Sequence, residues 1–361
     1  MVSTGDTIGV EEEFHVVNAD TGELEPAARR ILRGADAEPE LHRSMVETAT
    51  GVHGDLTALR ADLIEKRRSL VEAAGRLGLA IVAAGTVPGS GSGPSRVYPD
   101  ERYERMAQEY RQLVDEQQVA ACQVQVGVPD RDLAVRITRR IREWLPALLA
   151  LSVSSPYFAG QDTGYASYRT VVTSRWPTVG PPPDLGSAAE YQRVVDTLVD
   201  SGVISDAGMV YFDARPSARY PTVEVRVADS CPRVDDAVLL AALARGLVTV
   251  AAEEDAAGRP LPEAPQVLLR AATWRAARSG LSGHLVDPAT RSALPAGARV
   301  DALMTHVRPA LEARGEWDTA VDLLEDLRAR GTSATRQRAI GRAREVVQSL
   351  AKETAEGTGI S

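Results

Sequence analysis

The chain has 361 residues, of which 44% are hydrophobic and 25% charged, so it can bury a sizeable core and is not disordered throughout. Its net charge of -9 argues against a nucleic-acid-binding protein, which usually carries a basic surface. Its two cysteines offer neither a disulfide framework nor a thiolate zinc site.

Hydropathy and the first residues favour a cytoplasmic protein. Residues 1–9 have neither the basic nor the apolar region of a secretory signal. A transmembrane helix needs a run of about 18 apolar residues, and the sequence has no such run. We therefore expect no membrane and no nucleic-acid partner.

Hydrophobic periodicity predicts strands mainly before residue 230 and helices along the whole chain. In chain order, the predicted elements are a strand over 8–17, a strand over 41–50, a helix over 56–77, a strand over 79–84, a loop over 85–94, a helix over 103–116, a strand over 123–128, a long helix over 131–152, an irregular stretch over 160–183, a helix over 188–201, paired strands over 210–215 and 222–227, a helix over 235–256, and helices separated by turns over 267–355.

This segregation is typical of an α+β fold, in which an antiparallel sheet is backed by helices. No internal repeat or linker divides the chain. The run Pro181-Pro182-Pro183 is the best candidate boundary, but it is more consistent with a rigid loop inside one domain. We predict a single domain over 1–361 whose last third, from about residue 235, is helical.

The first predicted strand carries three consecutive acids, Glu11, Glu12 and Glu13. Side chains alternate along a strand, so Glu11 and Glu13 point to one face and Glu12 to the other. Two carboxylates on one face repel each other unless a cation lies between them, and oxygen ligands suit Mg²⁺ or Mn²⁺. The pattern alone leaves open a solvated edge strand with three surface acids.

Two other predicted strands carry further acids. The strand over 222–227 places Glu224 and Arg226 on one face. These two residues are either a surface ion pair or, in a phosphoryl-transfer site, a metal ligand and a phosphate clamp. Glu47 is a third acid, on the strand predicted over 41–50.

Six short motifs follow one another along the chain. They are Gly9-Val10-Glu11-Glu12-Glu13-Phe14, Ala84-Gly85-Thr86, residues 162–169 (Asp-Thr-Gly-Tyr-Ala-Ser-Tyr-Arg), Asp213-Ala214-Arg215-Pro216-Ser217, residues 222–229 (Thr-Val-Glu-Val-Arg-Val-Ala-Asp) and Ala334-Thr335-Arg336-Gln337-Arg338. In this order they resemble the motifs of the type 2 glutamate–cysteine ligase family, the carboxylate–amine ligases. Each motif is weak alone, but the collinear match from about residue 8 to residue 340 is specific.

The resemblance implies a fold like the catalytic domain of glutamine synthetase, a curved antiparallel sheet with metal-binding acids on its concave face. It also implies an ATP-dependent reaction between a small carboxylic acid and an amine. The γ-carboxylate of glutamate would attack the γ-phosphate of ATP to form an acyl phosphate, and the amine would then displace phosphate to give an amide. Mg²⁺ or Mn²⁺ is expected because ATP and the developing phosphoryl charge need metal ions. A homodimer is the default expectation, because related ligases often form dimers.

The resemblance further implies a metal and phosphate site built from the acids described above. By position, Glu13 and Glu224 look like ligands of one metal ion, and Glu11 and Glu47 look like ligands of another. Arg226 would contact the transferring phosphoryl group, so Glu224 and Arg226 are the predicted catalytic pair.

Five residues of the later motifs would bind the substrates. Arg169 would hold a substrate carboxylate, and Tyr165 and Tyr168 would line the same pocket. Arg336 and Arg338 would reach nucleotide phosphate. Each of these arginines could equally form an ion pair on a helix or loop, which is the structural alternative.

The sequence departs from the family at three positions that are usually histidine. Gln123 and Gln125 stand in a His-Val-His motif, and Val87 stands in a Gly-Thr-His-Pro motif. The second histidine position is a likely metal ligand in the family, and Gln125 could still ligate Mg²⁺ through its amide oxygen. The alternative is a catalytically impaired paralogue that binds a nucleotide or an acid. His15 could replace a lost ligand, although a packed histidine is the more ordinary outcome.

Overall fold

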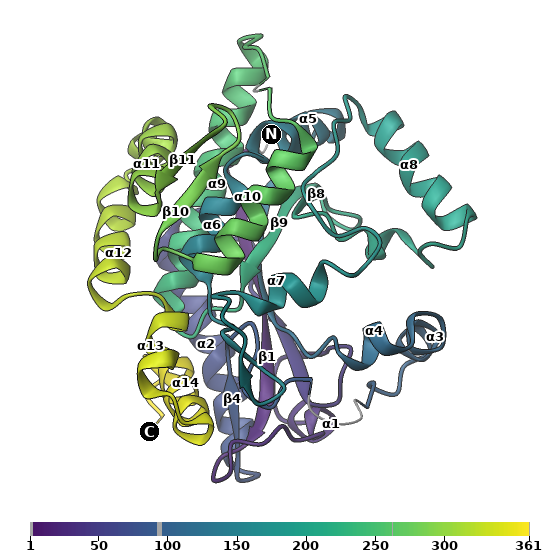
Figure 1. Cartoon of the computed structure of the whole chain (residues 1–361), viewed down its shortest axis with the longest axis vertical. Coiled ribbons are helices and arrows are strands. Elements are labelled where there is room, and N and C mark those ends of the chain that lie inside the picture. The colour runs from purple at the N-terminus through teal and green to yellow at the C-terminus, as the bar shows by residue number, and fades with distance from the viewer. Residues whose placement is uncertain (1–2, 92–95, 262, 361) are drawn as a thin grey trace.

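The structure is a computed structural model, which describes residues 3–91, 96–261 and 263–360. Its centre is a seven-stranded sheet with the order β2-β3-β1-β5-β9-β8, to which β4 is added beside β1 (Figure 1). All of these pairings are antiparallel. The strands are β1 (Ile8–Asn18), β2 (Glu38–Pro39), β3 (Met45–Ala49), β4 (Leu79–Val82), β5 (Ala121–Gly127), β8 (Ala214–Pro216) and β9 (Thr222–Asp229).

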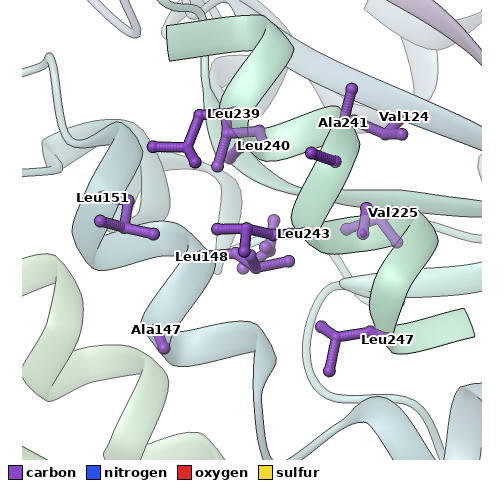
Figure 2. Close-up of a cluster of buried hydrophobic side chains, with 14 of the residues drawn as sticks. Val124, Ala147, Leu148, Leu151, Val225, Leu239, Leu240, Ala241, Leu243 and Leu247 are labelled. Atoms are coloured by element: carbon purple, nitrogen blue, oxygen red, sulfur yellow. The ribbon is translucent and has the colours of Figure 1, made fainter. Parts of the chain in front are cut away.

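One face of the sheet is covered by apolar helices. Figure 2 shows Val124 of β5 and Val225 of β9 pointing toward α9 (Val234–Ala256), behind which lies α6 (Leu145–Ser152). All eight residues of α6 are buried, so this helix lies inside the core rather than on its surface. Because side chains alternate along a strand, the residues on either side of Val124 and Val225 point to the opposite face.

The other helices surround this core. Helix α2 (Leu56–Gly75) packs against β1 and β4, and α5 (Arg131–Ile141) packs against α9. The remaining helices are α1 (Ala28–Ile31), α3 (Glu101–Tyr110), α4 (Gln112–Asp115), α7 (Tyr168–Thr173), α8 (Ala188–Asp200), the 3₁₀ turn η1 (Ala207–Met209), α10 (Gln266–Ser279), α11 (Ala296–Ala313), α12 (Trp317–Arg330), α13 (Ser333–Ile340) and α14 (Ala343–Ala355). Helices α11 to α14 line one flank of the molecule, and α3, α4 and α8 lie on the opposite flank (Figure 1).

Two predicted helices are broken in the structure. The helix predicted over 103–116 divides into α3 and α4 at Arg111, whose φ of +52° is not helical. The helix predicted over 131–152 divides into α5 and α6. Pro146 lies in the first turn of α6, where its missing N–H costs nothing, whereas inside a continuous helix its ring would clash with the preceding turn.

The prediction that residues 267–355 form only helices is wrong. A hairpin of β10 (His284–Asp287) and β11 (Ser292–Pro295) stands between α10 and α11. A second small pair, β6 (Tyr157–Phe158) and β7 (Gln161–Asp162), was also not predicted. Of the predicted loop over 85–94, residues 92–94 lie outside the described residues. The other predicted strands and helices are present with shifted ends.

The α+β class is confirmed. The largest buried apolar cluster contains side chains from Ile8 to Ala334, which supports the single domain that the sequence predicts. The division of the whole chain into domains otherwise stays a prediction. Within the described ranges, no helix combines the length and apolarity that a membrane crossing needs.

Candidate active site

The face of the sheet opposite α9 forms the floor of a cavity of about 830 Å³. Strand alternation brings side chains from three strands onto this floor. They are Glu11 and Glu13 of β1, Gln123 and Gln125 of β5, and Glu224 and Arg226 of β9. The remaining predicted metal ligand, Glu47 of β3, also lines the cavity. The structure therefore brings together every residue that the sequence assigned to the metal and phosphate site.

Strand register explains how these residues meet. Glu13 pairs with Glu47 across β1 and β3, and Glu11 pairs with Gln123 across β1 and β5. On the far side of β5, Gln125 pairs with Glu224. Residues directly opposite each other in antiparallel strands have Cβ atoms about 5 Å apart, so these pairs form one continuous polar surface.

The middle acid of the triplet, Glu12, points into the core, as alternation predicts. Its carboxylate accepts hydrogen bonds from Arg67 of α2, from Nε at 3.0 Å and from Nη2 at 2.5 Å. Both side chains are completely buried. Arg67 also donates to the backbone oxygens of Cys231 and Pro232, so the pair joins β1, α2 and the turn after β9.

A further acid, Glu40, lines the cavity and was missed from the sequence. Burial raises the pKa of Glu40. Burial and the charge of Glu40 raise the pKa of Glu13 to about 7, and the same two causes raise the pKa of Glu47 well above its usual range. Burial and the charge of Glu224 raise the pKa of Glu11. The only sequence signal for Glu40 is its place directly before the strand predicted over 41–50.

Glu224 differs from the other acids because two arginines neutralise it. Its carboxylate accepts from Nε of Arg215 at 2.9 Å and also forms an ion pair with Arg226. Burial alone would raise the pKa of Glu224, but Arg226 and Arg215 outweigh it and lower the pKa to about 2. Glu11, Glu13, Glu40 and Glu47 line the same cavity but, unlike Glu224, form no ion pair among the described residues.

The two glutamines link the acids to their neighbours. Gln125 donates from Nε2 to Glu11 at 3.2 Å, and its Oε1 accepts from the Thr222 hydroxyl at 2.5 Å. Gln123 donates from Nε2 to Glu13 at 2.8 Å, and its Oε1 accepts from Arg226. Gln123 thus lies between two charged groups, whereas Gln125 lies between a carboxylate and a hydroxyl group.

The donor set fits a hard divalent cation. Carboxylate and amide oxygens are the ligands that Mg²⁺ and Mn²⁺ prefer, and the raised pKa values of Glu13 and Glu47 mark negative charge that a cation would stabilise. In the described ranges, no three acidic, histidine or cysteine side chains already stand around a common ion position. The acids would therefore have to rotate toward a bound ion.

The predicted carboxylate-binding residues lie at the side of the cavity. Arg169 of α7 lines it and donates to the backbone oxygens of Val227 at 3.2 Å and Arg226 at 3.1 Å. Tyr165 lines it too, whereas Tyr168 is not among the described residues of its wall. The Tyr168 ring instead packs against Tyr165, with ring centroids 5.9 Å apart.

Arg336 and Arg338 are not among the described residues that line the cavity. Arg336 forms an ion pair with Glu353 at 2.5 Å. Arg338 forms one with Asp162 at 2.6 Å and donates to the backbone oxygen of Tyr165 at 2.8 Å. Their contact with a nucleotide stays a prediction, and the structure shows them in the ion pairs that were the structural alternative.

His15 and the glycine of the second motif are packed inside the fold. His15 is fully buried, Nε2 bonds to the backbone oxygen of Ala84 at 3.1 Å, and burial lowers its pKa to about 4. It is not among the described cavity residues, so His15 does not replace a lost ligand. A Cβ at Gly85 would lie 2.6 Å from Cγ of Asp229, so only glycine fits there.

Comparison with known families decides where this arrangement belongs. The sequence model of glutamate–cysteine ligase family 2 matches residues 7–353 of this chain. The chain belongs to this family. A relative from Frankia casuarinae, named "Putative glutamate--cysteine ligase 2-2", is 49% identical over 92% of this chain. A relative of the same name from Frankia alni is 45% identical over 96% of this chain.

The family members differ in length. The chain spans 39% of the Frankia casuarinae protein and 45% of a Rhodococcus jostii relative that is 46% identical, but 97% of the Frankia alni protein. The fold is that of a solved glutamate–cysteine ligase from Francisella tularensis in complex with AMP. Its TM-score is 0.67 and its identity 12%, over 99% of this chain and 90% of that one. A bifunctional glutathione synthetase from Pasteurella multocida has a TM-score of 0.68 at 16% identity, over 98% of this chain and 52% of that one.

Proposed function

We propose that this chain is an ATP-dependent carboxylate–amine ligase that forms a γ-glutamyl-type amide through an acyl phosphate. The observation that carries the proposal is the cavity floor, where Glu11, Glu13 and Glu47 lie beside the Glu224–Arg226 pair. Family membership supports the same reaction class, and a structure of the same fold was solved with AMP. A homodimer remains the default expectation for its assembly.

Mg²⁺ or Mn²⁺ would be held by Glu11, Glu13, Glu47, Glu224 and Gln125. Glu40 is a further candidate, because it lines the same part of the cavity and its charge acts on Glu13 and Glu47. When bound, the metal supplies neutralisation of phosphate charge. The Gln125 amide would turn its oxygen toward the ion, at the expense of its bond from Thr222.

Arg226 would stabilise charge on the transferring phosphoryl group, and the Glu224 carboxylate keeps its guanidinium in place. Arg169 would attract the carboxylate of the acid substrate, with Tyr165 beside it. For Arg338, the bonds to Asp162 and to the Tyr165 backbone favour a role in fixing the loop that carries Tyr165. Direct phosphate contact by Arg336 or Arg338 would require the loss of an ion pair.

A second candidate function is a nucleotide- or acid-binding protein without turnover. It is favoured by one observation, that Gln123 and Gln125 occupy hydrogen-bonding positions of Glu13 and Glu11 that a metal would otherwise use. Such a protein would be stabilised by Mg-ATP without releasing phosphate. Stabilisation coupled to repeated turnover would rule this candidate out.

The ligase reaction is tested by phosphate release. We expect purified protein with Mg-ATP to release ADP and phosphate only when a carboxylic acid and an amine are both present, with glutamate and cysteine tried first. Amide formation is followed by mass spectrometry in the same samples. If a broad set of acids and amines never raises phosphate release above background, the ligase proposal fails.

Metal binding should depend strongly on pH. The pKa of Glu13 is raised to about 7 and that of Glu47 is raised well above its usual range, so these groups hold protons that a metal must displace. In the ion-free protein, the protonated forms of Glu13 and Glu47 stabilise the fold at low pH. This stabilisation is lost as pH rises through their raised pKa values, and a bound metal ion would offset the loss. We expect Mn²⁺ to raise the melting temperature more at about pH 8 than at about pH 5.5. Equal stabilisation at both pH values would contradict this assignment.

A further inference from the structure

Asp213, the first residue of the fourth motif, has no part in the site described so far. It lines the cavity and is 8% exposed, and its Oδ2 is buried without a hydrogen-bond partner among the described residues. Its backbone is fixed, because its N–H donates to Gly180 at 2.8 Å and its carbonyl accepts from Arg226 at 2.8 Å. The buried Oδ2 atom of Asp213 therefore needs a donor that the described chain does not provide.

The other carboxylates near this wall are satisfied. Asp229 accepts from the Ser154 N–H at 2.9 Å and from the hydroxyls of Ser155 and Ser167, each at 2.7 Å. Asp206, on another part of the cavity wall, forms an ion pair with Arg102 at 3.0 Å. Among the described cavity-lining carboxylates, Asp213 alone has a buried oxygen without a partner.

The neighbours of Asp213 indicate which ligand would fit. Burial raises the pKa of Asp213 to about 7, although a hydrogen bond from the Thr273 side chain and the nearby positive charge of Arg169 both lower it. This positive charge disfavours a divalent cation at Asp213. The nearby Thr273 hydroxyl donates to the backbone oxygen of Leu269 at 3.3 Å. An organic ammonium group, which brings several N–H donors and one charge, meets the need of the carboxylate.

Asp213 and Arg169 together present one negative and one positive group on the same side of the cavity. An α-amino acid carries the two opposite groups on a single carbon. The amine that attacks an acyl phosphate must be unprotonated, whereas a carboxylate would favour its ammonium form. The ammonium group at Asp213 is therefore better assigned to the acid substrate than to the attacking amine.

We propose that Asp213 binds the α-ammonium group of the acid substrate, and so restricts that substrate to acids with a free α-amino group. This proposal rests on the ligase function proposed above. Asp213 is a specificity-determining residue in this assignment, because it touches a part of the substrate that does not react.

The test compares L-glutamate with glutarate, which has the same carbon chain without the amine. Dissociation constants are measured by calorimetry with Mg-ADP present, so that no turnover occurs. We expect the native protein to bind glutamate about tenfold or more tightly than glutarate, since hydrogen bonds to charged groups are worth this much. In Asp213→Asn the ratio should fall to near one, with glutarate binding unchanged or improved. Asp206→Asn is the control, because it removes the same charge from another part of the cavity wall and should keep the native ratio.

Three results would overturn the proposal. They are a ratio near one in the native protein, an unchanged ratio in Asp213→Asn, and an equal loss of glutamate and glutarate binding in that variant. The first needs no variant, so the proposal stays falsifiable even if Asp213→Asn does not fold. A tenfold preference for glutamate without phosphate release would remove the ligase function and leave the ammonium site standing. Selectivity that Asp213→Asn changes for cysteine but not for glutamate would assign the carboxylate to the amine and refute the proposal.

Discussion

Glu224→Gln should reduce amide-forming turnover by about a hundredfold to a thousandfold, the loss that follows when one preorganised charged group leaves a catalytic site. The Glu224 carboxylate is buried between Arg215 and Arg226, and its pKa of about 2 keeps it charged at every working pH. Glutamine has nearly the same shape but no charge. The variant would therefore lose a proposed metal ligand and would also leave the Arg226 guanidinium less firmly held.

The measurement is phosphate release at saturating Mg-ATP, acid and amine, with the melting temperature recorded for each protein. Glutamine is preferable to alanine because alanine would leave both arginines without their partner and would confuse activity with stability. Glu38→Gln is the matched control, since Glu38 is an exposed acid on the rim of the same cavity and should keep native turnover. Native turnover in Glu224→Gln would remove Glu224 from the catalytic assignment.

Glu12→Gln should destabilise the fold by about 3–5 kcal/mol, the usual cost of breaking a buried ion pair from one side. Glu12 and Arg67 are both fully buried, and the variant would leave the arginine charge without its counter-charge in the core. The loss would extend beyond one contact, because Arg67 also holds the backbone oxygens of Cys231 and Pro232.

Urea unfolding monitored by circular dichroism measures this effect. Glu13→Gln is the control on the same strand, one residue away and on the opposite face. Because Glu13 has a raised pKa and acidic neighbours, its replacement should leave the ion-free protein at least as stable as the native chain at about pH 8. Equal stability of Glu12→Gln and the native protein would show that the Glu12–Arg67 pair does not support the fold.

Much of the site could be predicted because strand alternation is a local property. The period of two correctly assigned Glu11 and Glu13 to one face and Glu12 to the other, and it placed Glu224 beside Arg226. To predict that Glu47 lies beside these acids, one must know the register between β1 and β3. This register depends on how distant segments of the chain pair. For that step the prediction relied on the family resemblance.

The remaining differences also have identifiable physical causes. Glu40 was missed because its carboxylate joins the cluster through the path of the chain before β3, and no periodic pattern marks that path. The structure shows Arg336 and Arg338, which the resemblance assigned to nucleotide phosphate, in ion pairs with carboxylates from other segments, and their contact with phosphate stays a prediction. An arginine in a motif does not indicate its partner until the chain is folded.

The acidic triplet on β1 shows what the sequence and the tertiary structure each determined. By itself, the sequence determined that the chain forms an α+β protein and that two of the three acids share a face, because hydrophobic periodicity and side-chain alternation depend only on neighbouring residues. The tertiary structure alone decided the environment of each acid. It enclosed Glu12 with Arg67 in the core, set Glu13 opposite Glu47 near the further acid Glu40, and left Asp213 with an unsatisfied oxygen. Burial and electrostatic partners arise from contacts between distant segments, and these contacts exist only in the folded chain.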